Sequence, residues 1–138
     1  MADLVSVAEA VAGELSRYDA KVCFLPEFKL SELSELRVVV VPTGIEEELA
    51  TRDSVGAVYK VSVGVLKKAD ESELPSLVEK VRAIGRHFLG RHLAGCSCVK
   101  AAYDPIYSPE QFREKRQFTG VAVLSFRTVE RHEDANLP

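Results

Sequence analysis

Apolar residues recur along the chain at two different spacings, and the spacing indicates which element each segment forms. Residues 4–18 place apolar side chains every three or four positions after Asp3, a candidate N-cap, and this pattern predicts an amphipathic helix. The same spacing is stronger within 70–93, where Ser72 is a candidate cap and Pro75 falls in the first turn. The pattern therefore predicts two helices.

Other segments follow a period of two, which is typical of strands. Strands are predicted at 36–44, 55–68, 95–105 and 117–130. One face of the second strand carries almost only apolar side chains, as expected for a sheet covered mainly on one side. A weaker segment at 21–28 is interrupted by Pro26, so we expect at most a short edge strand there.

The order of these elements predicts the fold class. Long strands that follow one another without a crossover helix favour antiparallel pairing. We therefore expect a single α+β domain over residues 1–138, with a mainly antiparallel four-stranded sheet, a short edge strand and two packed α-helices. Residues 130–138 are expected to form a flexible tail.

Two connecting segments carry a high density of charge. Residues 45–54 are predicted to be an acidic linker in solvent, because Pro42 and Gly44 should end the preceding strand. Before the last strand, Ser108 and Pro109 have the pattern of an N-cap and a first helical residue, which predicts a short helical turn. Phe112 and Phe118 bracket the charges there as expected core residues.

Composition argues against several classes of protein. The net charge is −3, no basic stripe stands out and Trp is absent, so a dedicated nucleic-acid-binding protein is not expected. No apolar run approaches the roughly 20 residues that span a bilayer. The acidic N-terminal segment is expected to be a helix of the mature protein, not a signal peptide. Three cysteines without an export signal predict free thiols and synthesis in the cytosol.

One cluster of residues could in principle bind zinc or supply a reactive thiol: His87, His92, Cys96 and Cys98. Five residues on a helix turn through about 140°, so the two histidines do not share a face. The cysteines follow a helix C-terminus, whose dipole disfavours a thiolate. We predict no catalytic, cofactor-binding or metal-binding residues and no cofactor, and keep a small metal-binding or thiol enzyme as an alternative.

The charged segments are candidates for contacts with other subunits or partners, although they could equally be solvated loops and helix faces. The candidate interface residues are Glu46, Glu47, Glu48, Arg52 and Asp53 in the acidic segment, Arg82 and Arg86 on the long helix, and Arg113, Glu114, Lys115 and Arg116 before the last strand.

The ordered motifs resemble one protein family over nearly the whole chain. After the N-terminal helix come "LRVVVVPTG", the Arg-containing "ATRDS", "VYKVSVGVLKK", the helix "LPSLVEKVRAIGRHFL" and the closing "DPIYSPEQFREKRQFTGVAVLSFRTV". In this combination the chain resembles the tail terminator, or tail completion, proteins of long-tailed bacteriophages and related neck proteins. The C-terminal "ERHEDANLP" and the pair Cys96/Cys98 depart from that pattern.

The resemblance implies a structural virion protein with a sheet flanked by helices. Such proteins form a ring, usually a hexamer, on the last ring of the tail tube, stop its growth and dock to the head connector. The implied partners are further copies of this chain, the major tail tube protein and the head–tail connector proteins. No membrane and no sequence-specific nucleic acid is expected, while DNA would pass through the ring. The implied location is the virion tail or neck, after synthesis in the host cytoplasm. A head–tail connector or stopper, another minor tail protein and a generic oligomeric ligand-binding domain are the alternatives.

Overall fold

The computed structural model describes residues 3–24, 35–103 and 106–131. The helices are α1 (Leu4–Glu14), α2 (Leu74–Phe88) and α3 (Pro109–Lys115), with 3-10 turns at Ser16–Tyr18 and Glu71–Glu73. The strands are β1 (Lys21–Val22), β2 (Arg37–Thr51), β3 (Ser54–Lys68), β4 (His92–Leu93), β5 (Cys96–Ala102) and β6 (Gln117–Arg131).

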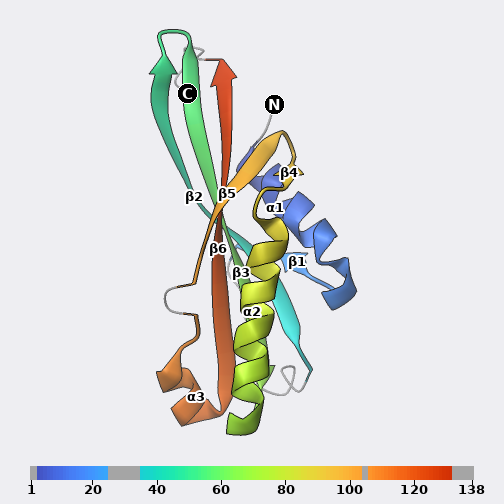
Figure 1. Cartoon of the computed structure of the whole chain (residues 1–138). Helices are drawn as coiled ribbons and strands as arrows, with labels where there is room; N and C mark the ends of the chain where they lie inside the picture. The colour runs from blue at the N-terminus through green and yellow to red at the C-terminus, as the bar shows by residue number, and fades with distance from the viewer. Residues whose placement is uncertain (1–2, 25–34, 104–105, 132–138) are drawn as a thin grey trace.

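The strands form one curled, six-stranded mixed sheet in the order β1-β2-β3-β6-β5-β4 (Figure 1). Strand β1 pairs with β2 in parallel, through Lys21 with Val39 and Val22 with Val40, and the other pairs are antiparallel. The predicted four-stranded antiparallel sheet with two helices is therefore wrong. A two-residue strand such as β4 carries too few positions for an alternating pattern, and pairing direction between β1 and β2 is decided by the path of the chain between them.

The third helix, α3, was expected only as a short helical turn and was not counted in the predicted fold. Its start agrees with the sequence pattern: the Ser108 hydroxyl accepts a hydrogen bond from the Gln111 amide at 3.4 Å, and Pro109 is the first helical residue. Phe112, in the middle of the helix, and Phe118, just after it, are both buried, as predicted. The charged segment is thus a short capped helix that returns the chain to the sheet.

Strand β2 is longer than the sequence pattern predicted. It continues past Pro42 and Gly44 to Thr51, so most of the expected linker 45–54 is strand. The pairing with β3 shifts register between Pro42 and Gly44. An irregularity of this kind accommodates a residue without an N–H, which is why proline did not end the strand. Residues Glu130 and Arg131, expected in a flexible tail, belong to β6, while 132–138 lie outside the described residues. Of the predicted edge strand at 21–28, residues 21–24 are described and include β1, and 25–28 lie outside the described residues.

Local capping explains where the two longer helices begin. The Asp3 side chain accepts a hydrogen bond from the Ser6 amide at 2.8 Å, which confirms it as the cap of α1. The predicted cap Ser72 is wrong. Asp70, two residues before Ser72, is the cap instead. It forms a capping box with Glu73, three residues later, and this box starts the 3-10 turn that leads into α2.

Helices α1 and α2 lie on the same side of the sheet and enclose the core with it (Figure 1). The predicted apolar face of β3 is confirmed over most of its length: Ala57, Tyr59, Val61, Val63 and Val65 are buried. Helix α2 contributes Leu77, Val81, Ile84 and Phe88, and β6 contributes Phe118, Ala122, Leu124 and Phe126. No helix among the described residues is long and apolar enough to cross a membrane.

Candidate functional site

Three long strands continue beyond the helices as an arm, which we define as residues 45–58 of β2 and β3 with 127–131 of β6 (Figure 1). The pairing of β5 with β6 ends at Arg127, so only β2, β3 and β6 extend to the tip. At the tip, the hydroxyls of Thr51 and Ser54 lie 2.6 Å apart across the turn that contains Arg52 and Asp53. Arg52 and Asp53 are therefore exposed at the end of a strand hairpin.

The register separates the acidic residues of the arm onto two faces. Ile45, Glu47 and Leu49 lie on the side of the sheet that carries the helices, and we call them the helix-side face of the arm. Their cross-strand partners on β3 are Tyr59, Ala57 and Val55. Glu46 and Glu48 point to the opposite, open side of the sheet. Neighbouring glutamates in the sequence thus face different surroundings.

A partly buried hydrogen bond joins the arm to the body of the protein. The hydroxyl of Tyr59, whose side chain is buried, donates to the Glu130 carboxylate at 2.8 Å. Burial, and then the hydrogen bond to this carboxylate, raise the pKa of Tyr59 well above its usual value. The neutral phenol therefore helps to hold the end of β6 against β3.

This bond predicts a loss of stability at alkaline pH. Because the folded-state pKa of Tyr59 is raised, its contribution is present below the unfolded pKa of about 10 and is lost as the pH rises above it. Tyr59→Phe lacks the bond, so it should be less stable than wild type at pH 8, and the difference should shrink by about 1.4 kcal/mol by pH 11. Urea unfolding at both pH values measures this. Parallel loss of stability in the two proteins would contradict the assignment.

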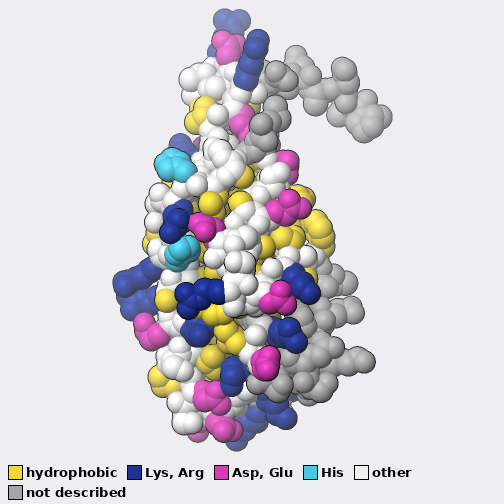
Figure 2. Space-filling view, turned by 90° about the vertical axis from the view of Figure 1, so that its right-hand side faces the viewer, with side chains coloured by type: hydrophobic (Ala, Val, Ile, Leu, Met, Phe, Trp, Pro, Cys, Tyr) yellow, Lys and Arg dark blue, Asp and Glu magenta, His cyan; other side chains and the backbone are white. Residues whose placement is uncertain are grey.

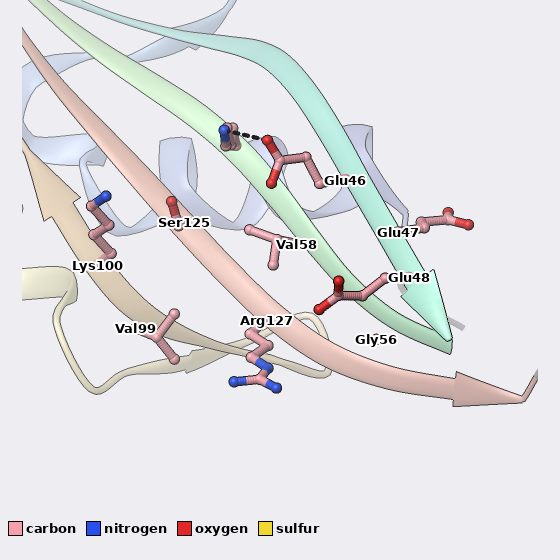
Figure 3. A pocket seen from close by; sticks show the side chains of 10 residues that line it. Glu46, Glu47, Glu48, Gly56, Val58, Val99, Lys100, Ser125 and Arg127 are labelled. Atoms are coloured by element: carbon pink, nitrogen blue, oxygen red, sulfur yellow. Dashed lines mark hydrogen bonds and ion pairs between the residues drawn. The ribbon is translucent and has the colours of Figure 1, made fainter. Parts of the chain in front are cut away.

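The open side of the sheet holds a groove of about 540 Å³ at the base of the arm (Figure 3). Its floor includes Gly56, Val58 and the buried Ser125. Glu46 and Glu48 of β2 line one side of the groove, and Val99 and Lys100 of β5 with Arg127 of β6 line the other. The groove thus has a largely uncharged floor between an acidic and a basic wall.

The two walls of the groove differ in how many of their charged side chains form ion pairs. Lys60 Nζ lies 2.9 Å from Glu46 Oε1, and this hydrogen bond lowers the pKa of the Glu46 carboxyl. Within the described residues, neither Lys100 nor Arg127 forms an ion pair. The basic wall therefore carries two positive charges without an ion-pair partner among the described residues.

The other candidate interface residues lie away from this groove. Arg82 and Arg86 are exposed on α2, where Arg82 Nη1 lies 3.9 Å from Glu79 Oε1. Helix α3 and its C-terminal residue carry Arg113, Glu114, Lys115 and Arg116, all exposed, at the end of the molecule opposite to the arm (Figure 1). The structure therefore distributes the predicted set over the arm, the helix layer and the far end, and it does not bring them together.

The candidate metal or thiol cluster is also dispersed. His87 lies on α2, 4.0 Å from Glu14, whereas His92 Nδ1 contacts the Ser97 hydroxyl at 2.9 Å. Cys96 and Cys98 are buried against the core, and burial raises the pKa of both thiols. No group of three or more potential ligands in the described part of the chain is arranged to hold a metal ion.

Sequence reasoning missed the apolar residues that the arm and its surroundings expose. Ile45, Leu49, Val99 and Val129 are all about half exposed or more, at 49%, 67%, 55% and 61%. The available signal was the even spacing of Ile45 and Leu49, which places both on one face if the strand continues beyond Pro42. The basic residues Lys100 and Arg127 carried no such signal, because they meet at the groove only through the pairing of β5 with β6.

No protein-family model matches the chain, and no curated protein sequence matches it.

Proposed function

We propose that this protein is a structural component of the neck of a long-tailed bacteriophage, which forms a ring on the end of the tail tube, stops tube polymerisation and offers a docking surface to the head connector. The observation that carries the proposal is the arm. It projects beyond the core and exposes charged and apolar side chains together, a combination suited to contacts between proteins.

Two further features support an assembly role. The charged surfaces lie at separate places, with acidic residues on the arm and arginines on α2. A head-to-tail ring requires two different, complementary patches of this kind on each subunit. The sequence motifs described above, in their order along the chain, resemble those of tail terminator proteins. The ring would be a homohexamer by the same resemblance.

A head–tail connector or another minor tail protein is the second candidate, because such proteins share the same motifs. The groove on the open side of the sheet favours it, because a recess with charged walls could hold a segment of a partner protein. The thiol alternative has little support, since a buried thiol with a raised pKa is protonated near neutral pH and is a poor nucleophile.

Electron microscopy of the purified protein, alone and mixed with tail tubes of the phage that carries its gene, tests the proposal. We expect rings of uniform diameter, either free or at one end of each tube, and tubes that no longer lengthen when tube protein is added. Sedimentation velocity of free rings should give a mass about six times that of the 15.2 kDa subunit.

The mixture with tail tubes is included because a ring protein can stay monomeric until it binds its template. If the chain stays monomeric at every concentration and also fails to bind tube ends, the proposal is wrong. Binding along the sides of tubes, without capping, would favour the minor tail protein instead.

A further inference from the structure

The helix-side face of the arm exposes apolar side chains around one negative charge. Ile45 and Leu49 are 49% and 67% exposed, and Glu47 lies between them on the same face of the strand. None of the described residues forms an ion pair with Glu47. A large exposed apolar side chain on each side of an unpaired carboxylate is typical of a surface that another protein covers.

The outer surface of α2 has the complementary character. Arg82, Ala83 and Arg86 of the helix and Leu89, which directly follows it, are exposed along one side of α2, and we call these four residues the α2 stripe. Arg86 has no ion-pair partner in the described part of the chain, and Leu89 is 45% exposed. The stripe thus pairs positive charge with apolar surface. Figure 2 looks onto the helix side, where basic side chains lie next to exposed apolar atoms.

The two surfaces have comparable lengths and the same order of residues, with the charged residue in the middle. Ile45 and Leu49 are four strand residues apart, about 13 Å, with Glu47 midway. The apolar positions of the stripe, Ala83 and Leu89, are six residues apart, about 9 Å along the helix axis, with Arg86 midway between them. A strand laid along the helix can therefore place Glu47 beside the arginines while Ile45 and Leu49 contact the apolar positions of the stripe.

This contact cannot form within one molecule. The arm projects from one end of the sheet, and α2 lies along the body below it (Figure 1). A contact between two different patches on identical chains is heterologous, and its repetition gives a ring when the rotation closes.

We propose that the helix-side face of the arm of one copy packs on the α2 stripe of the next copy, with Glu47 paired to Arg86 and Leu49 against Ala83. This inference deepens the proposed ring and rests on it, because it names the two surfaces that would join neighbouring subunits. The occupant of the arm face is a second copy of this chain.

Charge reversal tests the electrostatic part. Glu47→Arg should place like charges together and raise the concentration needed for half-maximal assembly by about tenfold or more. Arg86→Glu should have the same effect, and the double variant E47R/R86E should restore assembly. Glu9→Arg is the control, because it makes the same change at an exposed residue of α1 that belongs to neither surface, and it should leave assembly unchanged. Circular dichroism confirms that each variant is folded.

Disulfide trapping tests the packing directly. In a Cys23→Ser background, which removes the half-buried thiol and leaves the buried Cys96 and Cys98, the variant L49C/A83C should give a ladder of covalent oligomers up to the ring size on oxidation. A mixture of the two single variants should stop at dimers, since each chain then has one accessible thiol. L49C alone should give no dimer, because the contact is not symmetric.

The outcomes separate this inference from the proposed function. If wild type forms rings but Glu47→Arg assembles normally and L49C/A83C gives no ladder, the inference is wrong and the ring stands. If Glu47→Arg forms rings but no longer binds tube ends, the arm face contacts the tube protein, which also overturns the inference. If wild type neither assembles nor caps tubes, the proposed function fails.

Discussion

Replacing Phe88 with alanine should lower the free energy of unfolding by about 3–5 kcal/mol. Phe88 is the last residue of α2 and its side chain is fully buried in the core between the helices and the sheet. Removal of the ring would lose its apolar transfer free energy and leave a cavity that the surrounding side chains fill only in part. Urea unfolding followed by circular dichroism measures the change.

Phe24→Ala is the matched control, because it deletes the same atoms from a side chain that is 70% exposed. The control should change the free energy of unfolding by about 0.5 kcal/mol or less. Equal losses in the two variants would show that the core does not lie between α2 and the sheet as described.

Gly120→Ala should destabilise the protein by about 1–3 kcal/mol, although alanine normally suits regular structure better than glycine. A Cβ atom at this position of β6 would lie 2.7 Å from atoms of both Phe118 and Val81. Both side chains are fully buried, so neither can move away without disturbing the packing of α2 on the sheet. The absence of a side chain at 120 is thus what allows the helix to approach the strand.

Gly44→Ala provides the comparison on a second strand. A Cβ there would have no heavy atom within 4 Å, so we expect no loss of stability and a small gain from the reduced entropy of the unfolded chain. Thermal and urea unfolding of both variants would check the pair. A Gly120→Ala protein as stable as wild type would mean that α2 packs less closely on β6 than the structure indicates.

Sequence periodicity located most of the long helices and strands, because the spacing of apolar residues indicates which side of each element faces the core. Residues 55–68 alternate, and the alternation correctly identified the buried face of β3. Asp3 and Ser108 were found as caps because a cap bonds to amides only three residues away. Information of this kind is contained in a few neighbouring residues.

The errors fall where long-range pairing overrode a local signal. Pro42 and Gly44 are strand breakers by propensity, yet β2 continues through them because β3 supplies a partner strand on the far side of the irregularity. The acidic residues at 46–48 therefore lie in a strand and point to alternate faces. No property of the glutamates themselves distinguishes Glu47 from its two neighbours.

The candidate site shows the same division. The sequence identified charged residues of the arm and of α2, but it could not indicate that Lys100 and Arg127 share a groove with Glu46, nor that Tyr59 donates to Glu130 across 71 positions of the chain. Such neighbours depend on strand order and register.

By itself, the sequence determined the α+β class, the approximate positions of the helices and long strands, the buried face of β3 and the free, buried character of Cys96 and Cys98. Only the tertiary structure decided the six-stranded order, the parallel β1, the extent of the arm and the division of its residues between two faces. The physical reason is that periodicity and capping act within a few residues, whereas a shift of one residue in strand register moves every side chain of that strand to the opposite face.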